Sequence, residues 1–106
     1  MIGIIWNCRG VYKKGLNTFL KDLIGEYKVD FICIQETMRK KFTEKFFRTL
    51  DSQKNFKWFW IPSKGKSGGM LSGIKIERFD LENFESGEYT IIANIHDKMF
   101  KKIYLL

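Results

Sequence analysis

The feature that most restricts the fold is a pair of short apolar runs on either side of one amphipathic segment. Residues 2–6 and 31–35 each read as a β-strand, and residues 16–27 repeat apolar side chains at helical spacing. A strand, a crossover helix and a second strand favour parallel pairing of the two strands. The sequence therefore predicts a β-α-β unit whose two strands end at the same edge of a sheet.

Polar side chains follow both predicted strands directly. Asn7 comes after the first run and Glu36 after the second. The C-terminal edge of parallel strands is where open α/β sheets usually bind ligands. An amide and a carboxylate at that edge can together hold a hard cation and a phosphate group. From position alone, a surface salt bridge for Glu36 and a turn cap for Asn7 remain alternatives.

The rest of the sequence predicts one more helix and then only strands. The helix is expected at 43–50, with Thr43 as its N-cap residue. Strands are expected at 56–61, 69–76, 79–84 and 89–95, with another beginning at 99. One β-α-β unit thus leads into an antiparallel meander, which indicates an α/β protein with helices packed on a sheet.

The end of the chain suggests an incomplete domain. The 106 residues can form one domain at most, and the apolar run at 102–106 has no polar segment after it. Complete domains usually cover or blunt such a strand, because it invites pairing with other chains. We therefore expect part of a longer domain, with exposed sheet edges that favour self-association. A C-terminal strand placed in the centre of the sheet is the alternative.

Charge and cysteine content suggest the partner and the compartment. The net charge is +7, and residues 38–57 carry seven basic side chains against two acidic ones. Such a segment suits a polyanion, although a solvated helix face would look the same. No apolar run is long enough for a membrane span or a secretory leader. Cys8 and Cys33 are expected to be reduced thiols, so the expected location is nuclear or cytoplasmic.

Three segments in order resemble a known superfamily. They read WNCRG at 6–10, DFICIQET at 30–37 and GKSGG at 65–69. They resemble the opening of the endonuclease/exonuclease/phosphatase superfamily, to which deoxyribonuclease I and exonuclease III belong. The residues of these segments are most similar to those of the endonuclease domains of plant LINE-type, non-LTR retroelements. The resemblance extends over nearly the whole chain but over only the N-terminal half of a family domain, so residues 1–106 are expected to be a partial domain.

The resemblance implies a fold, a reaction and a set of site residues. The fold would be a four-layer α/β/β/α sandwich, here truncated after its first half. The reaction would be Mg²⁺-dependent hydrolysis of DNA phosphodiesters, with Mn²⁺ as an alternative metal. By motif, Glu36 would be the metal ligand, and Asn7 would help to position the phosphate and the catalytic water. Phosphate contacts are expected from nearby basic residues, namely Arg9, Lys40, Lys41, Lys64 and Lys66.

Several family elements do not occur in this sequence. An Asp-x-Asn pair like the family's GDFN and a terminal Ser-Asp-His are missing, and His96 matches no family element. Losing one member of a catalytic unit commonly lowers the rate by orders of magnitude. The chain by itself is therefore predicted to be inactive. A catalytically dead nucleic-acid-binding remnant and a small-molecule phosphoesterase of the same fold are the alternatives.

Two smaller features also have two interpretations each. Gly68 and Gly69 either permit a tight turn and a close backbone approach, or belong to a phosphate-binding loop. Phe56, Trp58 and Trp60 alternate along one strand. They form either a core-facing stripe or a platform on which nucleic-acid bases stack. In both cases the sequence favours the structural interpretation.

Overall fold

The first two strands and the helix between them form the predicted β-α-β unit. The computed structural model of the chain describes residues 2–10, 15–65, 68–86, 91–98 and 102–105. Strands β1 (Gly3–Asn7) and β2 (Phe31–Gln35) are parallel, with Asn7 opposite Gln35. Helix α1 (Leu16–Tyr27) makes the crossover between them. The predicted parallel pair, with one shared C-terminal edge, is confirmed.

Two further strands complete the first sheet in an unexpected order. Strand β4 (Met70–Lys75) is antiparallel both to β3 (Phe56–Ile61) and to β2. The order across the sheet is therefore β1-β2-β4-β3. Because both edges of β4 already have partners, the next strand cannot add to it and a new sheet begins. The expectation of one continuous meander is therefore wrong at this point.

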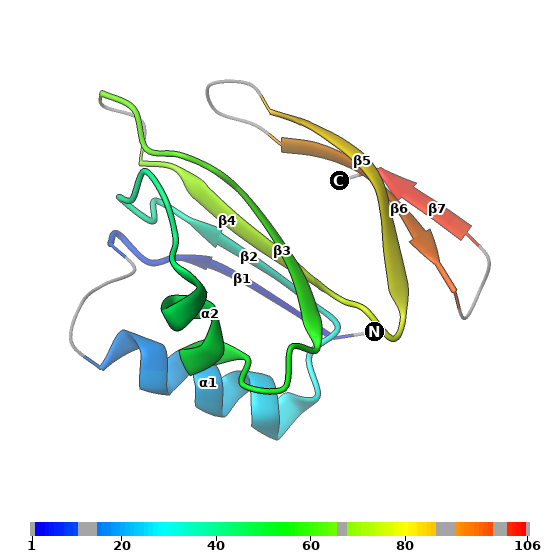
Figure 1. Cartoon of the computed structure of the whole chain (residues 1–106), viewed down its shortest axis with the longest axis horizontal. Helices are drawn as coiled ribbons and strands as arrows, with labels where there is room; N and C mark the ends of the chain where they lie inside the picture. Colours follow the sequence, from blue (N-terminus) through cyan, green and yellow to red (C-terminus); the bar gives the residue numbers. More distant parts are fainter. Residues whose placement is uncertain (1, 11–14, 66–67, 87–90, 99–101, 106) are drawn as a thin grey trace.

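A second sheet contains the remaining strands. Strands β5 (Phe79–Ser86), β6 (Ile91–Asp97) and β7 (Lys102–Leu105) pair antiparallel in chain order. Figure 1 shows this sheet on the side of the first sheet away from the helices. The observed layers are thus helices, first sheet and second sheet. The fourth layer of the expected sandwich stays a prediction, as does the assignment of residues 1–106 to half of a domain.

The main core lies between the helices and one face of the first sheet (Figure 1). Helix α2 (Glu44–Leu50) begins at its predicted cap, where the Phe46 N–H donates to Thr43 Oγ1 at 3.1 Å. Trp58 and Trp60 pack against this core, and the Trp58 ring stacks on Phe47 with 5.2 Å between ring centroids. The core interpretation of the aromatic stripe is therefore confirmed.

A smaller cluster lies on the opposite face of the first sheet. It joins Phe59 of β3 and Ile74 of β4 to Phe79 of β5. On β1 the same face carries Ile5, whose neighbours Ile4 and Trp6 pack against the main core. Ile5 is 71% exposed. The second sheet therefore covers the β3–β4 part of this face and leaves the β1 part open to solvent.

Two observations relate to the expected compartment, namely the state of the cysteines and the length of the helices. The compartment itself stays a prediction. Cys8 and Cys33 are free cysteines, as the sequence predicted. Burial raises the pKa of the Cys33 thiol, and a hydrogen bond with Ser72 partly opposes this. Neither helix in the described part of the chain has the length and apolar character that crossing a bilayer needs.

Candidate functional site

Asn7 and Glu36 lie at the same edge of the first sheet. The β1–β2 pairing extends past the strand ends, because the Cys8 N–H donates to the Gln35 carbonyl at 3.1 Å and the Gly10 N–H donates to the Glu36 carbonyl at 2.8 Å. Both Asn7 and Glu36 are exposed. The structure thus brings the predicted amide and carboxylate to one rim, from strands that are neighbours in the sheet.

The backbone around Glu36 has an uncommon conformation. Glu36 has a φ of 54° and Met38 a φ of 61°, both in the left-handed region that L-residues seldom adopt. Each such residue costs about 1–3 kcal/mol, so it persists only where its surroundings enforce it, and such strain is typical of functional sites. The buried Cys8 thiol donates towards the carbonyls of Gln35 at 3.5 Å and Glu36 at 3.7 Å. This loop is therefore held by its neighbours.

The glycine pair before β4 packs directly against this loop. A Cβ atom at Gly68 would lie 2.9 Å from the Glu36 Cα. Gly69 has a φ of 81°, and a Cβ there would lie 2.9 Å from the Ile61 carbonyl oxygen. The Met38 N–H donates to the Gly68 carbonyl at 2.6 Å. The close approach expected for the two glycines is confirmed.

Thr37 is part of the same contact and was missed in the sequence. Its side chain is fully buried at 0% exposure, and its hydroxyl donates to the Gly68 carbonyl at 3.4 Å. Its own N–H donates to the Gly69 carbonyl at 3.4 Å. One signal could have revealed this role of Thr37. It is a small hydroxyl residue directly after Glu36 in a sequence that also has a Gly-Gly pair at 68–69.

The charges at this rim are mostly open to solvent. Arg9 Nε lies 4.0 Å from Glu36 Oε2, and the two side chains are 81% and 47% exposed. An exposed pair of this kind is worth at most about 1 kcal/mol. Arg9 therefore lies beside Glu36 without being locked to it. Among the described residues, no group of three or more His, Cys, Asp or Glu side chains is arranged to hold a metal ion.

A basic hollow lies on the β2–α2 loop, the loop that begins at Glu36. It has a volume of about 330 Å³ and is lined by Met38, Arg39, Lys40, Lys41 and Ser63. The Ser63 N–H donates to the Arg39 carbonyl at 2.8 Å, which joins the loop to the end of β3. The predicted lysines 40 and 41 thus line one hollow. The sequence reasoning missed Arg39 and Ser63, although Arg39 belongs to the same basic run.

The last two predicted phosphate-binding lysines belong to the β3–β4 connection. Lys64 directly follows Ser63 and is exposed. Lys66 lies outside the described residues.

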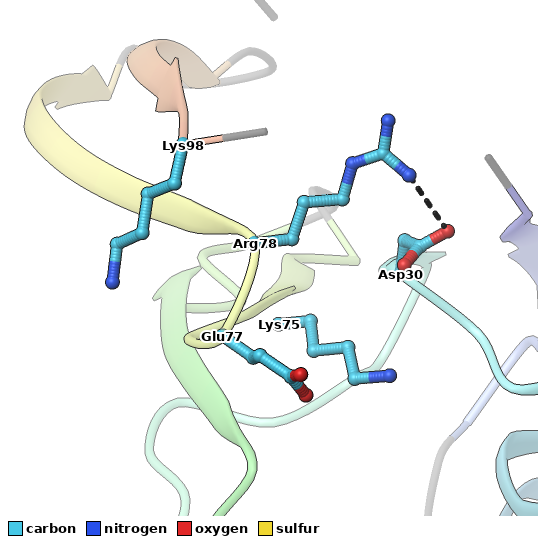
Figure 2. Close-up of a pocket in the computed structure, with 5 residues that line it drawn as sticks. All are labelled: Asp30, Lys75, Glu77, Arg78 and Lys98. Atoms are coloured by element: carbon cyan, nitrogen blue, oxygen red, sulfur yellow. Dashed lines mark hydrogen bonds and ion pairs between the residues drawn. The ribbon is translucent and has the colours of Figure 1, made fainter. Parts of the chain in front are cut away.

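The opposite end of the first sheet gathers a different set of charges. Figure 2 shows a hollow of about 320 Å³ lined by Asp30, Lys75, Glu77, Arg78 and Lys98. Arg78 lies 3.5 Å from Asp30 and 3.4 Å from Asp97, whose side chain is fully buried at 0% exposure. His96 is next to Asp97 and 4.0 Å from Asp80. As expected, His96 lies near the end of its strand, and it is at this end of the molecule rather than beside Glu36.

Solved structures of other proteins share this arrangement of strands and helices. D. rerio TDP2, solved with a single-strand DNA product, aligns with 97% of this chain at a TM-score of 0.65 and 13% identity. The catalytic domain of human Nocturnin with a bound sulfate anion aligns with 97% at 0.69 and 17% identity. The AP endonuclease LMAP of Leishmania major aligns with 88% at 0.60 and 19% identity. This chain shares a mixed α/β fold with part of these proteins, whose folds are deoxyribonuclease I-like.

The alignments cover only part of each of these proteins. This chain spans 42% of the TDP2 chain, 46% of the Nocturnin chain and 34% of the LMAP chain. No family model and no curated protein matches the sequence. The likeness at these identities shows the fold alone.

Proposed function

We propose that this chain provides the Asn7–Glu36 half of a metal-dependent phosphodiesterase that cleaves DNA, of the type found in LINE retroelements. One observation carries the proposal. The carboxylate and the amide share one rim of a parallel strand pair, and Gly68 packs so closely beneath Glu36 that a Cβ added there would lie 2.9 Å from the Glu36 Cα. The complete domain would be the four-layer sandwich, and this chain would be its N-terminal half.

The residues at the rim suit a hard divalent cation. Mg²⁺ prefers oxygen ligands and is commonly held by one or two carboxylates together with water. Glu36 offers one exposed carboxylate, and the neighbouring Asn7 offers an amide oxygen. Mg²⁺ or Mn²⁺ held by Glu36 would neutralise charge on the phosphoryl oxygens of the substrate. Among the described residues, no group of three or more His, Cys, Asp or Glu could hold the ion, so the proposal takes Glu36 alone as the carboxylate ligand from them.

The Asn7 amide and the basic residues predicted from the sequence would hold the substrate. The Asn7 amide N–H can donate to a phosphoryl oxygen while its carbonyl accepts a hydrogen bond. Arg9 can attract the same phosphate, because its contact with Glu36 is long and exposed. Lys40, Lys41, Lys64 and Lys66 would contact neighbouring phosphates. Their charge and the net charge of +7 fit a polyanionic substrate better than a small neutral one.

Two of the similar structures support the substrate class. One holds a single-strand DNA product and another holds a sulfate anion, which has the shape of a phosphate group. The retroelement assignment rests on the amino-acid sequences of the three segments at 6–10, 30–37 and 65–69.

A non-catalytic nucleic-acid binder is the second candidate. His96, the single histidine of the sequence, lies beside Asp97 rather than near Glu36. The described residues also contain no group of three or more His, Cys, Asp or Glu that could hold a metal ion. A chain of this kind would keep the basic residues of the rim but lack the base that activates water.

Nicking of supercoiled plasmid DNA in Mg²⁺ separates the two candidates. We expect no nicking by the 106-residue chain alone. The chain extended by the sequence that follows it in its gene should nick, and Glu36→Gln should lower that rate at least about a hundredfold. Lys21→Gln, on the exposed side of α1, is the control and should leave the rate unchanged. An extended chain that never nicks supports the binder. Nicking that survives Glu36→Gln contradicts the role of Glu36.

A further inference from the structure

Thr37 is a buried residue between two exposed neighbours of uncommon backbone conformation. Its side chain is 0% exposed, whereas Glu36 and Met38 on either side are exposed and have φ values of 54° and 61°. Left-handed backbone of this kind persists only where contacts enforce it. A β-branched side chain such as Thr has few rotamers, so its contacts have a fixed direction. Thr37 is thus well placed to hold Glu36 from inside the protein.

Three hydrogen bonds join this stretch to the glycine pair before β4. The Thr37 hydroxyl and the Met38 N–H both donate to the Gly68 carbonyl, at 3.4 Å and 2.6 Å. The Thr37 N–H donates to the Gly69 carbonyl at 3.4 Å. Thr37 and Gly68 are 31 positions apart in the sequence, so these bonds join two distant segments and do not belong to a local turn. Thr37 contributes to them with its side chain as well as its backbone.

Gly68 in turn packs against the aliphatic part of the Glu36 side chain. A Cβ added at Gly68 would lie 2.9 Å from the Glu36 Cα, 3.1 Å from its Cβ and 3.2 Å from its Cγ. The Glu36 side chain therefore begins in the space that a side chain at residue 68 would fill, and a shift of Gly68 would change the direction of the carboxylate. A chain of contacts runs from the Thr37 hydroxyl through Gly68 to Glu36.

We propose that Thr37 is a positioning residue for the Glu36 carboxylate. Its hydroxyl keeps Gly68 against the Glu36 side chain, so that the carboxylate stays at the rim it shares with Asn7. The inference rests on the proposed function for the cation at this rim, and it adds a residue that acts on the site without touching the cation. Removing a group that orients a metal-binding side chain commonly lowers metal affinity by about 10–100-fold.

Two substitutions at residue 37 separate the hydroxyl from the shape of the side chain. Thr37→Val keeps the branched shape and removes the donor, whereas Thr37→Ser keeps the donor. Thr49→Val is the matched control, because the exposed Thr49 hydroxyl donates to the Lys45 carbonyl at 3.0 Å within α2. Thr43→Val removes the N-cap of α2 and provides a destabilised chain with an unchanged rim. Urea denaturation followed by circular dichroism ranks the stabilities.

Amide hydrogen exchange in EDTA measures how firmly the loop is held. The Met38 N–H should exchange about tenfold faster in Thr37→Val, because the loss of one hydrogen bond favours local opening by about that factor. Thr37→Ser, Thr49→Val and Thr43→Val should exchange there like the unchanged chain. An unchanged Met38 rate in Thr37→Val, or an equal acceleration in Thr43→Val, would overturn the inference.

Titration with Mn²⁺ measures the effect on the cation site. The Mn²⁺ concentration that half-broadens the Asn7 amide signal should rise at least about tenfold in Thr37→Val. Thr37→Ser, Thr49→Val and Thr43→Val should need the same concentration as the unchanged chain. Thr43→Val shares a loss of stability, so a merely structural role of Thr37 would not separate the two variants. An Mn²⁺ response of Thr37→Val equal to that of the unchanged chain would contradict the positioning role.

Failure of this inference and failure of the proposed function have different signatures. If Mn²⁺ broadens neither Asn7 nor Glu36 in the unchanged chain, the cation site is contradicted, and exchange at Met38 alone decides whether Thr37 holds the loop. If Mn²⁺ binds equally well to Thr37→Val, the cation site stands and the role of Thr37 is wrong.

Gly68→Ala tests the same contact from its other side, should Thr37→Val fail to fold. The added Cβ would press on Glu36 and should weaken the Mn²⁺ response, whereas Thr37→Ser should preserve it. An unchanged Mn²⁺ response in Gly68→Ala would then overturn the inference.

Discussion

The two ends of the first sheet both gather charged side chains, but the ion pairs at one end are largely buried and the pair at the other end is exposed. At the end shown in Figure 2, Arg78 is 12% exposed and lies between the carboxylates of Asp30 and Asp97. At the other end, the Glu36 side chain is 47% exposed and its contact with Arg9 spans 4.0 Å. Charges that are buried and paired join parts of a fold, whereas exposed charges on a fixed backbone are available to a ligand.

The backbone differs between the ends as well. Glu36 and Met38 both have positive φ, and the glycine pair before β4 enforces their positions. The Arg78 end instead joins the two sheets, because the Arg78 side chain contacts Asp30 beside β2 and Asp97 in β6. The buried pairs of Arg78 thus stabilise one end, and the exposed charges of the other end fit the proposed ligand site.

The largest expected effect is at the Arg78 end. Arg78→Met leaves the fully buried Asp97 carboxylate without this cationic partner, so the free energy of unfolding should fall by about 3 kcal/mol. Urea denaturation followed by circular dichroism measures it. Lys54→Met removes an exposed pair with Glu44 and should cost less than about 0.5 kcal/mol. Similar losses in the two variants would contradict a structural role for the Arg78 end.

A smaller loss is expected at the glycine pair. Gly69→Ala places a side chain on a residue with a φ of 81° and within 2.9 Å of the Ile61 carbonyl, which should cost about 2 kcal/mol. Gly25→Ala is the matched control, because it lies in α1 with nothing within 4 Å of the added atom. That substitution should stabilise the protein by about 0.5 kcal/mol. If both substitutions raise the free energy of unfolding, the positive φ and the close approach at Gly69 do not restrain the backbone at the rim.

The smallest expected change in stability is at Glu36. Glu36→Gln removes an exposed charge with one long contact, so the free energy of unfolding should move by less than about 0.5 kcal/mol in the same urea experiment. A loss as large as that of Arg78→Met would show that Glu36 serves the fold. The division of roles between the two ends would then fail.

Local patterns in the sequence were enough to predict the elements that create the rim. The helical period of 16–27, the two apolar runs and the Thr43 cap each depend on residues near one another in the chain. These features, with the right-handed crossover rule, place Asn7 and Glu36 at one edge. The glycines at 68 and 69 also signalled a close approach, because glycine is the residue that tolerates one.

Partners that are distant in sequence could not be predicted. Strand β4 lies between β2 and β3 in the sheet. The residues of β4 alone do not indicate which other strands it pairs with. Arg78 meets Asp30 from 48 positions away and Asp97 from 19. Ser63 joins the basic hollow only because its N–H reaches the Arg39 carbonyl across two loops. Each of these contacts is set by tertiary packing, on which local propensity and periodicity carry no information.

Paramagnetic line broadening by Mn²⁺ tests most directly the claim that Glu36 and Asn7 form a cation site. Sub-stoichiometric Mn²⁺ is titrated into the labelled chain, and amide signals are followed by NMR. We predict that Asn7, Glu36 and Gly68 broaden first, that signals of Asp30 and Asp97 stay sharp, and that Glu36→Gln abolishes the early broadening. Broadening that begins at the Arg78 end, or that is unchanged in Glu36→Gln, would contradict the account.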